Sequence, residues 1–220
     1  MTPPNGSEPP ATTDATCLDA STLLKASTQG WRKDVRLSAA PRPLLHVRNQ
    51  SPSRPDLIPS DARALLKAVT TGQAPWPILM HGPVGTGKTC AALCVLDRCL
   101  FSRRYFTAQK MCEDAAAALC HELYDGAGYA MSTIAFWMAW SRADIACLDE
   151  IGSRSSRDKV SDHHYETVKR AIDERRGEPS IWISNLDPDG LAKVYDDRIA
   201  SRLSEGTIIM FAGADRRVQS

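Results

Sequence analysis

Eight consecutive residues have the types and spacing needed to bind a chain of phosphates. They read Gly82-Pro83-Val84-Gly85-Thr86-Gly87-Lys88-Thr89. Glycines at these positions let the backbone fold closely around phosphates, so that its N–H groups point inward at the anion. Lys88 would reach the β- and γ-phosphates, and the Thr89 hydroxyl would bind Mg²⁺. The segment therefore predicts a phosphate-binding loop (P-loop) for a nucleoside triphosphate with Mg²⁺.

Two adjacent carboxylates end a later apolar run. Asp149 and Glu150 follow residues 145–148, which are apolar throughout. We expect Asp149 to help hold Mg²⁺, either directly or through water. Glu150 would face the attacking water, as a general base or to orient the nucleophile. The alternative is a pair of exposed acids at the end of a strand.

An amide follows the next apolar segment in the same way. Asn185 comes directly after residues 181–184. At the end of a neighbouring parallel strand, its side chain would face the same crevice as Asp149. There it could position water or contact the γ-phosphate. A turn-forming asparagine before Asp187 is the alternative.

The elements that must position these groups alternate along the chain. Apolar segments predict strands at 78–81, 103–108, 144–150, 180–185 and 207–211. Helical patterns occur at 61–69, 88–100, 109–124, 132–141, 163–176 and, for the most part, 190–204. This alternation predicts an α/β fold with a parallel sheet and helices on both faces. The strand before the P-loop and the helix after it also argue against a simple glycine-rich turn.

Composition limits the other possibilities. The 220 residues carry a formal net charge of +1, so no global field marks the chain as a nucleic-acid binder. The seven cysteines show no metal-type spacing. No apolar run reaches the length of a membrane span, so we expect a cytoplasmic protein with no membrane partner. Prolines and few apolar residues predict a disordered or extended tail over 1–55, followed by one domain over 56–220.

Taken together, the motifs resemble those of one family. Besides the P-loop, they are Leu148-Asp149-Glu150-Ile151-Gly152, Ile183-Ser184-Asn185-Leu186, Asp197–Leu203 followed by Gly206, Tyr105–Ala108, and Gly213-x-Asp215-Arg216. In order and spacing, over about residues 60–217, the chain resembles the AAA+ ATPases of the DnaC/IstB helicase-loader group. The resemblance implies a P-loop NTPase (AAA+) three-layer sandwich with a five-stranded parallel sheet. Because few residues follow Arg216 in this sequence, we expect no separate C-terminal lid domain.

The resemblance also implies roles for particular residues. These are Walker A for Lys88 and Thr89, Walker B for Asp149 and Glu150, and sensor 1 for Asn185. Arg202 looks like the arginine finger that completes a neighbouring subunit's site, with Arg198 assisting, and Arg216 is the only candidate for a second sensor. For the two arginines of residues 197–203, the alternative is a surface helix with ordinary ion pairs such as Asp197–Arg202.

Three functions follow from this resemblance. The first is an ATP-hydrolysing helicase loader or DNA-replication accessory protein, which self-associates with ATP and binds a replicative helicase and single-stranded DNA. The second is an IstB-like helper that binds duplex DNA and stimulates a transposase. The third is a nucleotide-gated adaptor with little turnover. Candidate DNA-binding groups, each of which could equally be solvated surface, are Arg103, Arg104, Arg154, Arg157 and Lys159.

Overall fold

We describe the protein from a computed structural model, which places residues 58–99, 102–152 and 162–215. The strands are β1 (Ile78–His81), β2 (Arg103–Thr107), β3 (Ile145–Ile151), β4 (Ser180–Ser184) and β5 (Thr207–Met210). The helices are α2 (Ser60–Thr70), α3 (Lys88–Arg98), α4 (Ala108–Leu119), α5 (Thr133–Ser141), α6 (Asp162–Asp173), α7 (Pro188–Val194) and α8 (Asp197–Leu203).

The five strands form one sheet in the order β2-β3-β4-β1-β5, and every neighbouring pair is parallel. The strand that leads into the P-loop is therefore central, with Met80 paired to Ile183 of β4 and to Ile209 of β5. Because all strands run the same way, their carboxyl ends meet at one edge of the sheet. The predicted five-stranded parallel sheet is confirmed, and after β5 the described residues, which end at Asp215, contain no further helix.

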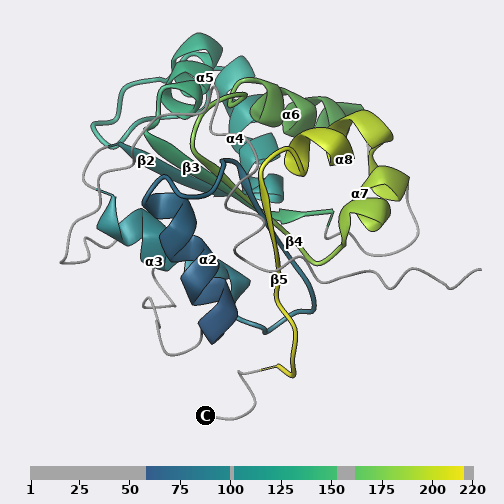
Figure 1. The fold of residues 1–220 in the computed structure, drawn as a ribbon. Coiled ribbons are helices and arrows are strands. Elements are labelled where there is room, and N and C mark those ends of the chain that lie inside the picture. The colour runs from purple at the N-terminus through teal and green to yellow at the C-terminus, as the bar shows by residue number, and fades with distance from the viewer. Residues whose placement is uncertain (1–57, 100–101, 153–161, 216–220) are drawn as a thin grey trace, which may run out of the picture.

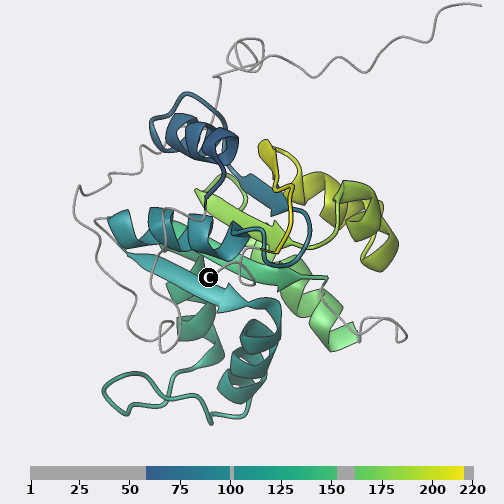
Figure 2. The same cartoon turned by 90° about the horizontal axis from the view of Figure 1, so that it is seen from below.

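Alternating side chains of the strands build a separate core on each face. On β3, Cys147 packs with α2 and α3, whereas Ala146 and Leu148 pack with α4 to α8. Figure 1 shows this division, with α2 and α3 on one side of the sheet and the other helices opposite. Seen from below in Figure 2, the sheet lies between the two groups of helices. The molecule is thus a three-layer sandwich, as expected.

The predicted helices differ most from the observed ones in two places. The helix predicted over 109–124 stops at Leu119, and His121 then takes a positive φ of 61°. The helical stretch predicted over 190–204 is divided into α7 and α8, because the Asp196 side chain accepts a hydrogen bond from the Ile199 N–H and caps a new helix. The chain therefore turns just before the segment that carries Arg198 and Arg202.

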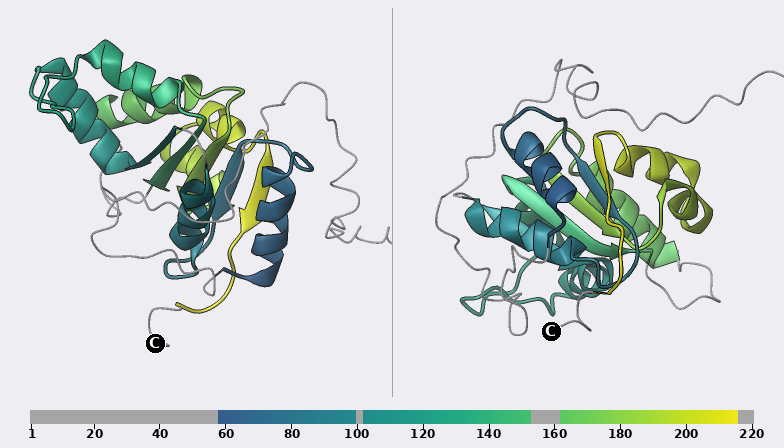
Figure 3. Two further views of the ribbon diagram at one scale, coloured as in Figure 1. Left: turned by 90° about the vertical axis from the view of Figure 1, so that its left-hand side faces the viewer. Right: turned by 60° about the horizontal axis from the view of Figure 1, so that its bottom comes forward.

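The two edge strands of the sheet have different neighbours (Figure 3). One edge strand, β5, has α2 packed beside it, and the α4–α5 hairpin projects beyond the opposite edge at β2. Within the described residues, no helix is both long enough and apolar enough to cross a bilayer.

A buried arginine ties together the amino-terminal ends of β3 and β4. Arg175 is 1% exposed. Its guanidinium donates to the carbonyl oxygens of Ala143 at 2.5 Å and Ser141 at 3.0 Å, just before β3. It also donates to Pro179 O at 2.5 Å and to Ser180 Oγ at 3.2 Å, where β4 begins. Burial lowers the pKa of Arg175 to about 10, which leaves it charged at neutral pH.

Candidate functional site

A cleft of about 300 Å³ opens at the carboxyl-terminal edge of the sheet. The P-loop and the start of α3 form one wall, and Asp149, Glu150 and Asn185 contribute from the ends of β3 and β4. The structure thus brings together the P-loop, the two acids and the amide that the sequence singled out. Three separate stretches of chain meet here because β3 and β4 are neighbours in the sheet and β1 lies next to β4.

Two P-loop glycines are required by close contacts with the segment after β5. A Cβ atom on Gly82 would lie 2.1 Å from the carbonyl oxygen of Phe211. One on Gly85 would lie 2.0 Å from Oδ1 of Asp215. Both glycines also have positive φ, 130° and 79° respectively. A side chain at either position would clash and would force the backbone into an unfavourable conformation.

Lys88 extends along the P-loop and is only 6% exposed. Its Nζ donates to the carbonyl oxygens of Gly82 and Pro83, each at 2.6 Å. The Thr86 hydroxyl donates to the same Pro83 oxygen at 2.8 Å. These bonds hold the ammonium group over the loop, next to the backbone N–H groups at the start of α3. A positive charge and a helix N-terminus therefore face one small volume, an arrangement that favours a phosphate.

The Asp149 carboxylate is held by three donors. Oδ2 accepts from the Thr89 hydroxyl at 2.7 Å and from the Tyr105 hydroxyl at 2.8 Å. Oδ1 accepts from the backbone N–H of Glu150 at 2.6 Å. Burial raises the pKa of Asp149, and the three hydrogen bonds act in the opposite direction because they favour the charged form.

The donor set at this point fits a magnesium ion. The Thr89 hydroxyl and the Asp149 carboxylate, 60 residues apart in the chain, are in direct contact and offer only oxygen atoms. Among the residues that the structure places, no group of three or more His, Cys, Asp or Glu side chains could hold a metal. A site with one carboxylate, one hydroxyl and room for phosphates is the kind that Mg²⁺ takes, since this ion keeps most of its water.

A bulge in β3 lets both neighbouring acids line one cleft. Between the pairs Leu148–Trp182 and Ile151–Ser184, β3 advances three residues while β4 advances two. Glu150 is the extra residue, with a left-handed φ of 59°. In a regular strand, Asp149 and Glu150 would point to opposite faces. With the bulge, both line the cleft, while Ile151 packs into the core on the α4–α8 side.

This backbone strain has a measurable consequence. A left-handed conformation costs a non-glycine residue about 1 kcal/mol, and glycine avoids this cost. Glu150→Gly is therefore expected to be more stable than Glu150→Ala by about 1 kcal/mol, although both remove the same carboxylate. Urea denaturation of the two variants measures the difference. A Glu150→Ala protein at least as stable as Glu150→Gly would contradict the strain.

The electrostatics of Glu150 follow from the same position. Two causes raise the pKa of Glu150: partial burial, which is the larger, and the nearby Asp149 charge. The carboxyl group is exposed enough to meet water in the cleft. Asn185 is also exposed and faces the cleft from the end of β4. Beside it, the Ser184 hydroxyl donates to Ile151 O at 2.7 Å and fixes the turn after the bulge.

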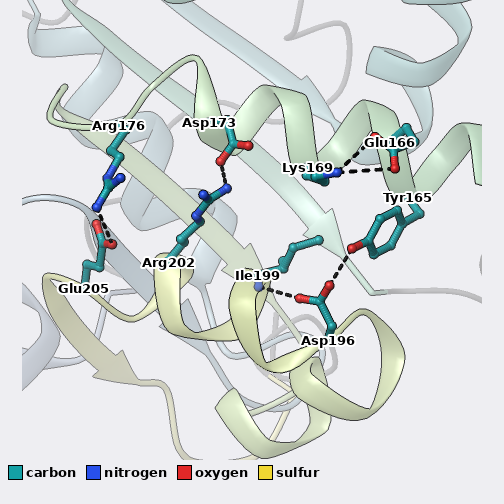
Figure 4. Close-up of polar contacts among 9 residues, drawn as sticks. All are labelled: Tyr165, Glu166, Lys169, Asp173, Arg176, Asp196, Ile199, Arg202 and Glu205. Atoms are coloured by element: carbon teal, nitrogen blue, oxygen red, sulfur yellow. Dashed lines mark hydrogen bonds and ion pairs between the residues drawn. The ribbon is translucent and has the colours of Figure 1, made fainter.

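The two arginines of α8 lie away from this cleft. Arg198 is exposed, whereas Arg202 is 16% exposed and forms an ion pair with Asp173 of α6. Figure 4 shows this pair between the two helices, with Arg176–Glu205 beside it. Within α8 the predicted alternative partner was Asp197, but the ion pair of Arg202 is with Asp173. Several positions of interest lie outside the described residues: 1–55, Arg154, Arg157, Lys159 and Arg216.

Two side chains at the site were not assigned a role from the sequence. Tyr105 bonds to Asp149, and Asp215 lies against Gly85. Both belong to segments that carried the family resemblance, but nothing in the local pattern indicated a contact with the P-loop or its acid. The signal that could have found Tyr105 is its place in a strand that neighbours β3, two positions before the strand end.

Comparisons with known proteins identify the fold. No protein-family model matches the chain, and no curated protein matches it. Among solved structures, domain III of the replication initiation protein DnaA from Thermotoga maritima aligns with a TM-score of 0.50 and 19% identity, over 77% of this chain and 72% of that one. A DnaC helicase loader aligns with a TM-score of 0.50 and 18% identity, over 61% and 77% of the two chains.

A third match is AMPPCP-bound DnaA from Aquifex aeolicus, with a TM-score of 0.53 and 18% identity over 73% of this chain. The alignment spans only 51% of that DnaA chain. These matches confirm the predicted fold, the three-layer arrangement of P-loop AAA+ domains, and the resemblance to DnaC-type proteins at the level of the fold alone.

Proposed function

We propose that this AAA+ domain binds and hydrolyses ATP with Mg²⁺ and serves DNA replication in the cytoplasm as a DnaC-like helicase loader. One observation carries the ATPase assignment. The Thr89 hydroxyl at the start of α3 bonds to the buried Asp149 carboxylate, and Glu150 is strained into the same cleft. A phosphate loop, an acid for the metal and a second acid facing water are the parts that hydrolysis of a phosphoanhydride needs.

The residues of the cleft divide the work of binding. The backbone N–H groups of the P-loop and the Lys88 ammonium bind the phosphates. Thr89 and Asp149 would supply oxygen ligands for Mg²⁺, which when bound would neutralise charge on the phosphates. Val84, exposed at the mouth of the cleft, offers an apolar contact to the nucleotide.

The residues opposite the P-loop act on the nucleophile. Glu150 accepts a hydrogen bond from the attacking water and orients it or removes its proton. Its raised pKa brings the carboxyl closer to the pH at which a general base works best. The Asn185 amide, the proposed sensor 1, lies in the same cleft and can hold the water or a γ-phosphate oxygen.

Self-association would complete the site. We propose that an arginine of α8 stabilises charge on the γ-phosphate of a neighbouring subunit. Arg198 is exposed and available for this role, whereas Arg202 must first leave Asp173. Turnover then depends on assembly, with a replicative helicase and single-stranded DNA as the partners that promote it.

ATP hydrolysis by the purified protein, with and without DNA, tests this function. We expect single-stranded DNA to stimulate turnover, and Glu150→Gln to lower it by about 100-fold while ATP stays bound. Phosphate release and binding of a fluorescent ATP analogue measure the two effects. Glu122→Gln, an exposed acid outside the cleft, is the matched control and should behave as the unmodified protein.

Other outcomes would replace parts of the proposal. Stimulation by duplex DNA instead of single strands would favour the helper of a transposase over the helicase loader. Bound ATP with no turnover under any condition would favour a nucleotide-gated adaptor. Undiminished turnover in Glu150→Gln would remove this residue from its assigned role.

A further inference from the structure

Tyr105 reaches the metal-binding acid from a neighbouring strand. It lies on β2, where its backbone pairs with Cys147 of β3, two residues before Asp149. Its ring packs against the core on the α2–α3 side of the sheet. Its hydroxyl donates to Asp149 Oδ2 at 2.8 Å, the same oxygen that accepts from Thr89 at 2.7 Å. The ring is thus fixed by packing, and the hydroxyl is aimed at one carboxylate oxygen.

We propose that Tyr105 is a positioning residue that holds Asp149 in the orientation needed to bind Mg²⁺, an inference that rests on the proposed function. The two donors to Oδ2 differ in what they do when the metal is present. The Thr89 hydroxyl oxygen would itself be a ligand of the ion. Tyr105 has no such role and continues to hold the carboxylate.

Such a partner has a recognised effect on metal binding. Groups that hydrogen-bond to a metal ligand fix its orientation before the ion arrives, and their loss typically weakens metal binding by 10- to 100-fold. Asp149 is 3% exposed, so water cannot easily replace a lost donor. The third bond, from the Glu150 N–H, is to the other oxygen and comes from the strained bulge. The Tyr105 bond is therefore the side-chain contact that stays with Oδ2 throughout.

A purely structural role would also use these contacts, since a half-buried tyrosine hydroxyl needs a partner. The two roles differ in what they predict for Tyr105→Phe, which keeps the packed ring and removes only the hydroxyl. Loss of a structural bond would change stability and would leave the metal dependence of nucleotide binding as it was. Loss of positioning would change the concentration of Mg²⁺ that nucleotide binding requires.

The experiment is a titration of the full chain with Mg²⁺ at a fixed, low concentration of a fluorescent ATP analogue, repeated with EDTA in place of metal. For Tyr105→Phe, we expect the half-saturating Mg²⁺ concentration to rise by about tenfold. In EDTA, the variant and the unmodified protein should bind the analogue equally. Tyr165→Phe is the matched control, because it removes a tyrosine–aspartate bond, to Asp196, outside the cleft (Figure 4). It should show the unmodified Mg²⁺ dependence.

The other outcomes distinguish a failure of this inference from a failure of the proposed function. An unchanged Mg²⁺ requirement in Tyr105→Phe would overturn the positioning role and leave the ATPase proposal standing. Equal weakening of binding with Mg²⁺ and with EDTA would also overturn it, since a general loss of packing is then responsible. If the unmodified protein bound the analogue no better with Mg²⁺ than with EDTA, the proposed metal site would fall together with this inference.

Discussion

Lys88→Ala is expected to reduce ATP turnover by about 10²- to 10³-fold, the largest effect of any single substitution in the cleft. The ammonium group is almost fully buried against the P-loop and is held by the Gly82 and Pro83 carbonyl oxygens. Removal takes away the charged donor that we propose for the phosphates, and no other side chain of the described P-loop carries positive charge. Phosphate release and binding of a fluorescent ATP analogue measure the loss.

The control for this prediction is Lys67→Ala on α2. Lys67 is exposed and carries the same charge, but it does not line the cleft. Turnover close to that of the unmodified protein is expected. Because Lys88→Ala also deprives two carbonyl groups of a donor, its unfolding must be measured alongside. A folded Lys88→Ala protein that retained half of its turnover would refute the assignment of this loop as the nucleotide site.

Arg175→Ala is expected to lower the free energy of unfolding by about 3 kcal/mol or more, with urea denaturation followed by circular dichroism as the measurement. The guanidinium serves four carbonyl oxygens and one hydroxyl, belonging to Trp140, Ser141, Ala143, Pro179 and Ser180. Truncation leaves these acceptors buried with fewer donors and leaves a cavity as well. The change lies at the end of the sheet opposite the cleft.

The adjacent arginine is a matched control for this effect. Arg176 carries the same charge on the next residue, but its side chain is 66% exposed and meets Glu205 at 3.8 Å. Surface pairs of this kind contribute little, so Arg176→Ala should change the stability by no more than about 0.5 kcal/mol. Equal losses in the two variants would show that the buried hydrogen bonds of Arg175 are not the cause.

Local sequence patterns were sufficient for most of the fold. Four strands were visible as short, mainly apolar runs, β2 as the mixed run RRYFT, and the alternation with helices predicted a parallel sheet. The P-loop could be read directly because its chemistry depends on consecutive residues. Asp149 and Asn185 could be placed at the cleft because parallel strands deliver their carboxyl ends to one edge. These predictions required no knowledge of side-chain contacts between distant segments.

The missed features depend on contacts between distant segments. The bulge at Glu150 exists only in the register between β3 and β4, which the sequence of either strand leaves open. The Tyr105–Asp149 hydrogen bond joins two neighbouring strands through residues that are 44 positions apart in the sequence. In the sequence, Arg175 is one of several charged residues near the end of a predicted helix. Only the folded chain shows the carbonyl oxygens that its guanidinium contacts. The Asp196 cap was local, but a continuous helical pattern concealed it.

The order of strands has a consequence for how the chain folds while it is being synthesised. β1, which leads into the P-loop, pairs only with β4 and β5, and both are made much later. Phe211, directly after β5, also packs its backbone against Gly82 of the loop. While the ribosome is still translating the middle of the chain, β1 has no strand to pair with, so neither the sheet nor the P-loop can take its final form. If the P-loop binds ATP as proposed, ATP therefore cannot stabilise the nascent chain, and one edge of this apolar strand stays unpaired until β5 has emerged.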